Sequence, residues 1–464
     1  LTHYVIEEII NWLSANDQII ELEIVFIRVK ASNKTIAPGR TKMAKNKKTS
    51  SKVSRRQFVG GAAGAVAASS VVGFPAIVSA ADPIRAIGLG VSIINEIQSR
   101  AAKDIGFGIR GQALGYGALF GKTLNQNDQY EVSECYFDMF DAMVPSKVFQ
   151  PIDTKRIRDW DKVSNLVKTG MLTPGSQIGQ GDAPVTKLWV DKDGNPTDGP
   201  SRYISAVPAA HNADSLGYNP DDTGRAIDSW GELYSPDFKG KVALINVPQV
   251  GVMDAAMGME ALGLAKFGDK GDMTRAEIDT LIEFLIVKKK EGHFRAFWET
   301  FGQSVNLMVS GEVALQSMWS PAVTAVNAEG VKCVYASPKE GMRGWHGALA
   351  ISAKASGKKL DQAYEYINWW LDGWAGAFVA RQGYYFSTPA NTQKHLPKAD
   401  WDFWYEGKPA SMELNDPFGT PLIAKGAVRD GGSYEQRFKK IAVWNSIMKE
   451  NDYLVKRWTE FLGA

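Results

Sequence analysis

The stretch IRAIGLGVSIINEIQSRAAK, residues Ile84–Lys103, joins a short apolar run to a longer amphipathic one. Its first part, Ile84–Leu89, has the length and composition of a buried strand and is followed by Gly90. Its second part, Val91–Lys103, repeats apolar side chains at the spacing of one helix face: Ile93, Ile94, Ile97 and Ala101. A strand followed directly by a helix is the repeating unit of α/β proteins, so the stretch predicts this class.

The same alternation continues toward the C-terminus. Further strands are predicted at Lys241–Ile245, Val331–Ala336 and Ala348–Ser352. A helix is predicted to begin at the capping box formed by Thr274 and Glu277 and to end before Gly292. A second, long helix is predicted over Leu360–Ala380. Because helices separate successive strands, we expect an α/β fold with largely parallel sheets.

The first 80 residues have the composition of a leader. The first methionine is Met43, and we expect residues 1–42 to be a non-native extension, the alternative being a genuine N-terminal segment. From Met43 onward, basic residues, an apolar tract and a small-residue motif follow in the order of a signal peptide. The pair Arg55-Arg56 in SRRQFV resembles the twin-arginine export signature. We predict a signal peptide at 43–80, cleavage near Ala80 and a periplasmic location; a transmembrane anchor is the alternative.

Setting the leader aside changes the charge balance. The whole chain of 464 residues has 53 basic and 51 acidic residues, whereas residues 81–464 have 42 basic and 46 acidic ones. The excess of basic residues therefore belongs to the leader. The mature balance gives no reason to expect a nucleic acid or an anionic membrane surface as a partner.

No familiar catalytic or metal-binding motif is complete. Gly117–Thr123 ends like a phosphate-binding loop, but its first glycine is one position too close. Gly88–Ile93 lacks the third glycine of a dinucleotide-binding motif. Cys135 and Cys333 are expected to be isolated buried thiols, although an exported protein could pair them. We expect no cofactor, no metal and no enzymatic activity.

Aromatic residues are the feature that remains. The chain has 14 tryptophans, and several aromatic residues lie beside Gly, Pro or polar residues, as loop residues do: Trp319, Trp345, Tyr384 and Tyr385. Aromatic walls with a few polar groups suit a cleft for a small organic molecule, and a ring face attracts a cation. The alternative for each ring is packing in the core, which we expect for Trp370 and Trp374.

Five segments in a fixed order carry a resemblance to a known family. They are VPAAHNADSLGYN (Val207–Asn219), SWGELYSPDFKGKVALIN (Ser229–Asn246), SGEVALQSMWSPA (Ser310–Ala322), PKEGMRGWHGALAIS (Pro338–Ser352) and RQGYYFSTPAN (Arg381–Asn391). Together they resemble the periplasmic solute-binding proteins of ABC importers, and most closely the spermidine/putrescine-binding branch. The resemblance covers roughly Ile84 to Asn391 and matches the remaining C-terminal residues less clearly.

The resemblance implies a two-lobed periplasmic-binding-protein fold of type II-like topology. Two α/β lobes would be joined by crossing hinge strands near Val207–Asp214 and Gly344–Ile351, with a central ligand cleft. One lobe would comprise residues 81–208 and 346–390, and the other residues 209–345 and part of 391–464. The family implies that a small-molecule solute closes the lobes and that ABC permease subunits recognise the closed form. We expect a monomer.

The family's binding residues transfer to this sequence by motif. Trp319 matches the cleft tryptophan, Trp345 the second cleft aromatic, and Tyr384 or Tyr385 the tyrosine after the final helix. The loop after the first strand offers Ser92, and the turn after the third strand offers Glu134 and Tyr136. These matches predict an aromatic ligand site.

The sequence departs from the family pattern at two places. Because of these departures, the ligand is either a polyamine or another small amine or amino-acid-like compound. Gly347 stands where the family has an acid, and the loop after the strand at 241–245 contains only Asp254. A buried ammonium without a carboxylate partner is costly, so Glu134, Asp214 and Asp254 are the candidate replacements. His346 would suit a ligand carboxylate or hydroxyl. His211 and His346 could instead be hydrogen-bonded hinge residues.

Two other functions are alternatives to the solute receptor. The twin-arginine signature is compatible with a folded periplasmic enzyme. The pair Tyr384-Tyr385 is compatible with a ferric-iron-binding receptor of the same fold.

Overall fold

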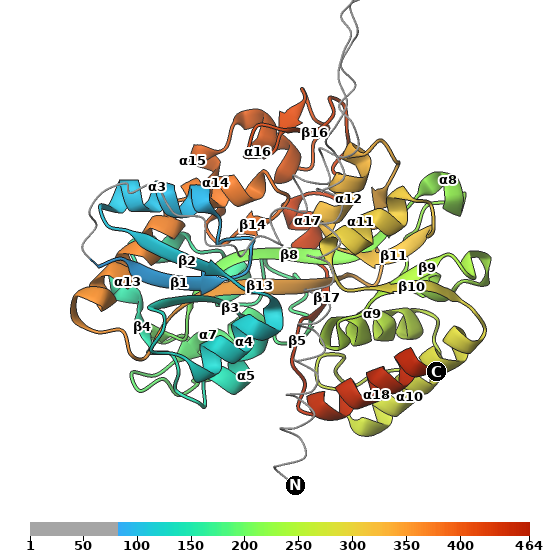
Figure 1. Ribbon diagram of the computed structural model, residues 1–464, viewed down its shortest axis with the longest axis horizontal. Coiled ribbons are helices and arrows are strands. Elements are labelled where there is room, and N and C mark those ends of the chain that lie inside the picture. Colours follow the sequence, from blue (N-terminus) through green and yellow to red (C-terminus); the bar gives the residue numbers. More distant parts are fainter. Residues whose placement is uncertain (1–81) are drawn as a thin grey trace, which may run out of the picture. The chain divides into compact units, whose positions relative to one another are not determined.

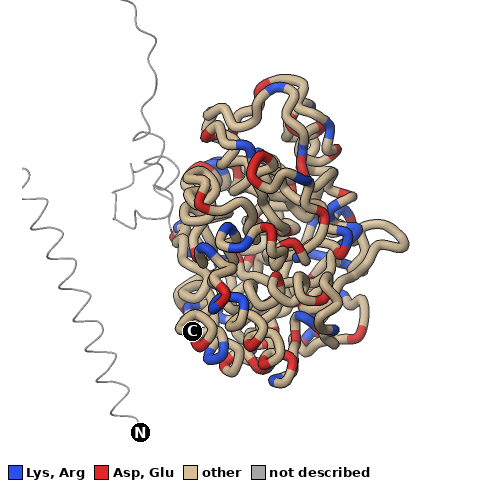
Figure 2. Tube along the Cα trace, turned by 90° about the vertical axis from the view of Figure 1, so that its right-hand side faces the viewer, with Lys and Arg blue, Asp and Glu red and all other residues tan. Residues whose placement is uncertain are grey.

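A computed structural model describes residues 82–464, and these form a mixed α/β structure (Figure 1). The expectations for residues 1–42 and for the signal peptide at 43–80, with its cleavage near Ala80, lie outside the described residues. Among residues 82–464, no helix has both the length and the apolar character needed to cross a membrane. Figure 2 shows basic and acidic residues interspersed along this part of the chain.

A curled sheet of 12 strands forms the centre of the structure. Eight of its strands follow one another in the order β10-β9-β11-β8-β13-β3-β1-β2. Their bounds are β1 (Ile84–Gly88), β2 (Ile109–Ala113), β3 (Val132–Tyr136), β8 (Val207–Tyr218), β9 (Val242–Ile245), β10 (Phe294–Trp298), β11 (Leu315–Met318) and β13 (Met342–Ile351). Strands β1, β2 and β3 are mutually parallel, as are β9, β10 and β11. The expected parallel sheets are thus present, but an antiparallel centre formed by β8 and β13 separates them.

Strands β8 and β13 run through the middle of the sheet. They pair with each other from Val207 opposite Leu349 to Asp214 opposite Arg343, and β8 then continues alongside β11. The predicted crossing segments at 207–214 and 344–351 lie within these two strands. The register shifts at Gly347, where an added Cβ would lie 2.9 Å from the Ala210 carbonyl oxygen, so only glycine fits there.

The sequence predicted three of the long helices, and the bounds of two of these differ in the structure. The bounds are α3 (Asn95–Ile105), α4 (Tyr116–Asn125), α9 (Pro248–Ala261), α10 (Arg275–Lys290), α11 (Phe301–Val309), α12 (Ser320–Ala328), α13 (Gly357–Leu371), α14 (Trp374–Ala380) and α18 (Asn451–Gly463). The capping box of Thr274 and Glu277 begins α10 as predicted. The helix expected from Val91 begins only at Asn95, because the preceding residues form a turn.

The single helix expected over Leu360–Ala380 is wrong, since α13 and α14 are separate helices. Gly373 lies between them with a φ of +109°, a conformation that favours glycine. The backbone of Asn391 also approaches this glycine so closely that an added Cβ would lie 2.4 Å from its carbonyl carbon. A tertiary contact, invisible in the helical pattern, therefore ends the first helix.

The C-terminal segment completes the sheet and covers one side of its centre (Figure 1). Its elements are β14 (Tyr385–Phe386), α15 (Pro389–His395), α16 (Lys398–Trp404), β15 (Leu414–Asn415), β16 (Pro421–Ile423), α17 (Tyr434–Phe438) and β17 (Ile441–Trp444). Strand β14 pairs with β8 and strand β17 pairs with β13, so both central strands gain a neighbour from this segment. Helix α18 returns to pack against α10 and α9.

Shorter elements fill the connections. They are α5 (Phe140–Met143), β4 (Ile152–Asp153), α6 (Asn165–Lys168), β5 (Gln180–Gly181), α7 (Pro184–Leu188), β6 (Trp189–Val190), β7 (Tyr203–Ile204), α8 (Pro220–Thr223) and β12 (Val334–Tyr335). Cys135 lies in β3 and Cys333 precedes β12; both are buried free thiols, as expected.

Candidate functional site

Three of the predicted site residues form one aromatic group, here defined as Tyr136, Trp345 and Tyr384. The ring of Trp345, on β13, lies 5.7 Å from the Tyr136 ring at the end of β3 and 5.9 Å from the Tyr384 ring before β14, measured between centroids. Tyr136 is buried, whereas Trp345 and Tyr384 are partly exposed. The fold thus brings together rings from three segments that are distant in the sequence.

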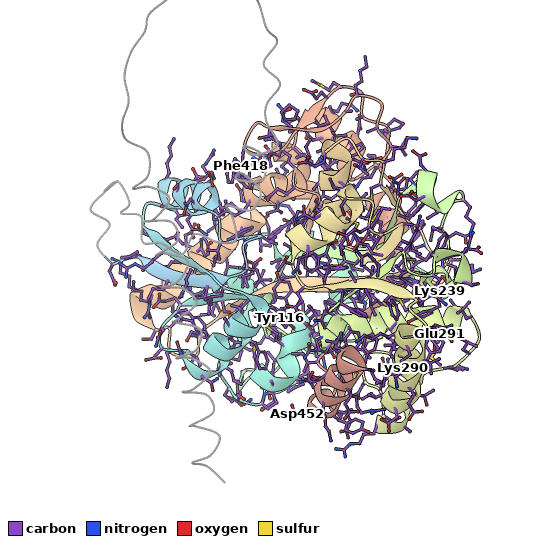
Figure 3. The ribbon with its side chains drawn as sticks, turned by 45° about the vertical axis from the view of Figure 1, so that its right-hand side comes forward. Tyr116, Lys239, Lys290, Glu291, Phe418 and Asp452 are labelled. Carbon is purple, nitrogen blue, oxygen red and sulfur yellow. The ribbon has the colours of Figure 1, made fainter. Side chains whose placement is uncertain are left out.

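A tyrosine–aspartate pair that the sequence did not indicate lies beside the aromatic group. Tyr116, at the start of α4 and labelled in Figure 3, has its ring 6.1 Å from that of Tyr136. Its hydroxyl donates a hydrogen bond of 2.5 Å to the Asp138 carboxylate. Burial raises the pKa of Asp138 to about 6, against the opposing effect of this hydrogen bond. Asp138 therefore supplies negative charge near the rings at neutral pH.

Asp214 and Asp254, two of the expected ligand carboxylates, are already paired with an arginine. The Arg343 Nε donates to Asp254 Oδ1 at 2.7 Å, and Arg343 Nη1 lies 3.4 Å from Asp214 Oδ2. All three side chains are at most 2% exposed. Burial raises the pKa of both carboxyls, that of Asp214 to about 7, because one guanidinium cannot fully neutralise two buried carboxylates. Both acids share the charge of Arg343, but Asp214 Oδ1, Asp214 Oδ2 and Asp254 Oδ2 have no hydrogen-bond partner among residues 82–464.

Glu134 is the third expected carboxylate, and it has no such partner. It lies in β3, is 2% exposed, and its Oε2 has no hydrogen-bond partner among residues 82–464. Burial raises the pKa of Glu134 to about 8. Burial therefore favours the neutral acid at pH 7, and a cation placed beside Glu134 would favour its carboxylate.

Trp319 and Ser92 have their recorded ring contact and hydrogen bond outside the aromatic group. Trp319 caps the start of α12, and its ring meets that of Trp298 edge-on with 4.9 Å between centroids. Ser92 is buried in the turn after β1, where its hydroxyl contacts the Leu89 carbonyl at 3.4 Å. Within the described chain, neither residue makes a ring contact or a hydrogen bond to the aromatic group.

His346 and Tyr385 belong to the packing around the central strands. The His346 ring stacks on His211 with 4.4 Å between centroids, and its Nδ1 lies 2.8 Å from the Gly347 carbonyl. Burial lowers the pKa of both histidines, that of His346 to about 4. Tyr385 is fully buried and donates its hydroxyl to the Trp404 carbonyl at 3.0 Å. Of the two adjacent tyrosines, only Tyr384 therefore lies in the aromatic group.

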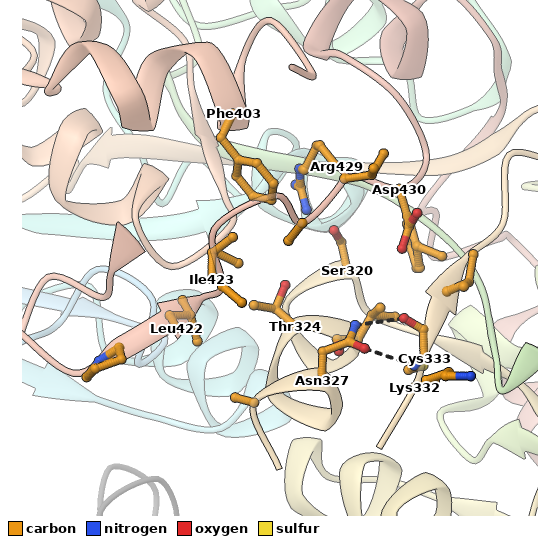
Figure 4. Close-up of a pocket in the computed structure, with 18 of the residues that line it drawn as sticks. Ser320, Thr324, Asn327, Lys332, Cys333, Phe403, Leu422, Ile423, Arg429 and Asp430 are labelled. Carbon is orange, nitrogen blue, oxygen red and sulfur yellow. Dashed lines mark hydrogen bonds between the residues drawn. The ribbon is translucent and has the colours of Figure 1, made fainter. Parts of the chain in front are cut away.

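A cavity of about 540 Å³ lies against one face of α12 (Figure 4). It is lined by α12, the residues around β12, strand β16 and the segment 427–430. None of the predicted site residues lines it, although Ser320, which follows Trp319, does. The predicted site residues therefore do not line this cavity.

The residues from Ala102 to Asp402 match the family described as bacterial extracellular solute-binding protein. This chain belongs to that family. All predicted site residues of this solute-binding protein except Ser92 lie within the matched range, whereas α17, β17 and α18 lie beyond it.

Individual relatives agree with the family. This solute-binding protein is 26% identical over 265 residues to the spermidine/putrescine-binding periplasmic protein 1 of Haemophilus influenzae. The match covers 56% of this chain and 64% of that protein, so it falls short of the relative's full length.

Solved structures show the fold. The spermidine/putrescine ABC transporter substrate-binding protein PotD of Streptococcus pneumoniae superposes with a TM-score of 0.58 at 15% identity, covering 82% of this chain and 99% of that one. The Atu4243-GABA receptor superposes with a TM-score of 0.52 at 16% identity, covering 82% of this chain and 97% of that one. The predicted periplasmic-binding-protein fold of the solute-binding protein is thereby confirmed.

Proposed function

We propose that the protein is the solute-binding component of an ABC importer, which captures a small organic solute outside the cytoplasm and delivers it to a membrane permease. The observation that carries the proposal is the aromatic group, because Trp345 on a central strand meets Tyr136 and Tyr384 from two other segments. Partly exposed rings with a few polar neighbours are the usual lining of small-molecule sites. A receptor of this kind performs no chemistry on its solute.

The proposed lobes are residues 81–208 with 346–390, and residues 209–345 with part of 391–464. Two hydrophobic clusters support this division. One contains Ile87, Val132 and Ile367, and the other contains Leu244, Ile282 and Trp458 from α18. Because β8 and β13 connect the two clusters, a solute touching Trp345 would lie beside the hinge, where differential binding to a closed state has the largest effect.

The charges near the aromatic group favour a solute with one ammonium over a polyamine with several. Asp214 and Asp254 share the charge of one arginine, Arg343, and burial raises the pKa of Glu134 to about 8, which favours its neutral form. The remaining attraction for a cation comes from the ring faces and from Asp138 beside Tyr116. A small amine or amino-acid-like solute therefore fits this arrangement better than spermidine.

The pair Tyr384-Tyr385 gives no support to the ferric-iron alternative. Tyr384 faces Trp345, whereas the Tyr385 hydroxyl is used by the Trp404 carbonyl in the core. The two phenols would not reach one metal ion without rearrangement of the C-terminal segment.

The test combines native mass spectrometry of the freshly purified chain with a thermal-shift screen. Putrescine, spermidine and 4-aminobutyrate are the first three solutes, and we expect at least one small amine to raise the Tm, because a ligand that binds only the folded state stabilises it. Trp345→Ala should weaken that binding at least about tenfold, since the aromatic face is lost. Trp401→Ala, in a stacked pair with Tyr405 outside the group, is the matched control.

Three results would count against the proposal. These are an absence of any bound or stabilising solute, unchanged affinity in Trp345→Ala, and an equal loss in Trp401→Ala. Trp319→Ala tests the second tryptophan separately, and unchanged affinity there would remove Trp319 alone from the site.

A further inference from the structure

One face of α12 is turned toward the cavity shown in Figure 4. The α12 residues that line the cavity follow the spacing of a single helix face: Ser320, Val323, Thr324, Asn327 and Ala328. The facing wall is mainly apolar and includes Phe403 of α16 with Leu422 and Ile423 of β16. The cavity thus has an apolar wall opposite a helix that offers the hydroxyls of Ser320 and Thr324.

Arg429 brings a positive charge to this cavity. It is 6% exposed, lies over the Trp404 ring at 4.6 Å, and in Figure 4 its guanidinium lies between Phe403 and Ser320. Its Nη2 makes one long hydrogen bond of 3.4 Å, to the Tyr385 hydroxyl. Among residues 82–464, its Nε has no hydrogen-bond partner and no carboxylate oxygen lies within 4.0 Å of the guanidinium. A buried donor of this kind is satisfied when an anion enters the cavity.

A second buried arginine increases the positive charge. Arg437 is fully buried, and its Nη1 donates to the Ser320 hydroxyl at 3.3 Å. Burial and the neighbouring Arg429 lower the pKa of Arg437 to about 10, so both guanidiniums stay charged at neutral pH. Asp430 is the carboxylate that lies close enough to influence both. Asp214 also faces Arg437, so Arg429 is the guanidinium left with Asp430 alone.

The other charged residues that line the cavity do not supply a negative charge to Arg429. Lys332 is paired with Asp221 at 2.8 Å, and Glu413 is exposed to solvent. The positive charge that lacks a carboxylate at ion-pair distance is therefore that of Arg429, beside the apolar wall.

We propose that this cavity binds a small organic carboxylate, whose anionic group pairs with Arg429 and whose apolar body lies against Phe403, Leu422 and Ile423. The planar guanidinium suits the two oxygens of a carboxylate, and the hydroxyls of Ser320 and Thr324 lie on the opposite wall as further donors. The apolar lining favours such an acid over inorganic phosphate. The site does not depend on the proposed function, because no residue of the aromatic group lines it.

Isothermal titration calorimetry of the folded chain with 4-phenylbutyrate tests the proposal. Its amine counterpart, 4-phenylbutylamine, and inorganic phosphate are the comparison ligands. We expect the acid to bind with one equivalent and more tightly than either comparison ligand. Arg429→Gln should weaken its binding at least about tenfold, because a charge-assisted bidentate pair is lost. Lys425→Gln, on the same loop but outside the cavity, should leave it unchanged.

Two further variants keep the result decisive. Ala328→Trp fills the cavity from an exposed position on α12, so it should abolish binding even if Arg429→Gln does not fold. Trp345→Ala should leave the binding of 4-phenylbutyrate unchanged, whatever it does to the transported solute. The proposal is overturned if the acid does not bind, if the amine binds equally well, if phosphate binds more tightly, or if Trp345→Ala abolishes binding while Ala328→Trp does not.

Discussion

Two buried arginines differ in the charges that surround them. Arg343 crosses from β13 toward α9 and contacts both Asp254 and Asp214. Arg429, in the C-terminal segment, has aromatic rings and a tyrosine hydroxyl around it and is over 4.0 Å from any carboxylate oxygen of the described chain. Arg343, Asp214 and Asp254 form a charge cluster within the protein, whereas Arg429 remains available to pair with a ligand anion.

A comparison of Glu134 with Arg429 shows why a buried acid and a buried arginine respond differently to the lack of a charged partner. An unpaired buried carboxyl can keep its proton, and burial indeed raises the pKa of Glu134 to about 8. An arginine cannot lose its proton at neutral pH, so an unpaired buried guanidinium stays charged. A lone buried acid is thus a stable feature of a core, while a lone buried arginine indicates an anion site.

Removing Arg343 gives the largest expected effect. Arg343→Met leaves Asp214 and Asp254 buried together without a cation, and the free energy of unfolding should fall by about 3–5 kcal/mol. Urea unfolding at pH 7 measures it. Lowering the pH should restore part of the loss, because protonation removes the charge of both acids. A loss below about 1 kcal/mol would show that the charge cluster is not what stabilises this region.

Glu134→Gln should remove part of the pH dependence of stability. Glu134 keeps its proton up to about pH 8 when folded, whereas an unfolded glutamate releases it near 4.5. Between these values the folded state binds more protons, so its stability falls as pH rises. The variant should therefore gain about 3–4 kcal/mol relative to wild type from pH 5 to pH 8. Urea unfolding across this range measures the difference, with the exposed Glu96→Gln as control; parallel curves for wild type and Glu134→Gln would contradict the assignment.

The sequence predicted the aromatic group better than the charge cluster. Tyr136, Trp345 and Tyr384 were candidates because their motifs match those of the family that the sequence resembles, with Tyr385 as the alternative to Tyr384. Nothing local links Arg343 to Asp254, which lies 89 positions away in the chain. The available signal was a single arginine within the otherwise apolar and glycine-rich segment GMRGWHG (Gly341–Gly347). Such a residue in a buried strand needs a partner, but only the fold identifies it.

The fold shows the same division between local and distant information. The capping box of α10 and the apolar run of β9 are local signals, and both were found. The break at Gly373 and the pairing of β17 with β13 depend on contacts with distant residues, and both were missed. The C-terminal segment, where Arg429 lies, is therefore where sequence reasoning was weakest.

Gly347→Asp tests whether the acid that the family resemblance implies at this position would change the ligand. We expect a loss of about 1–2 kcal/mol in the free energy of unfolding, because a Cβ would lie 2.9 Å from the Ala210 carbonyl oxygen. Gly347→Ala, which adds the Cβ without the charge, should lose nearly as much. Affinity for putrescine should not increase in either variant. A gain in putrescine affinity confined to Gly347→Asp would show that this single residue sets the ligand class.

Arg429→Met has the smallest expected effect on stability and tests the comparison most directly. The variant loses the contact with the Trp404 ring and one long hydrogen bond, but it also removes a buried charge that has no carboxylate within ion-pair distance. These effects oppose each other, so the free energy of unfolding should change by less than about 1 kcal/mol. Urea unfolding beside Arg343→Met, under the same conditions, measures the contrast. A loss as large as that of Arg343→Met would mean that Arg429 stabilises the fold as Arg343 does, and the two arginines would then not differ in role. A small change in stability together with loss of 4-phenylbutyrate binding would separate them, because a charge that the fold does not need would then be required by a ligand.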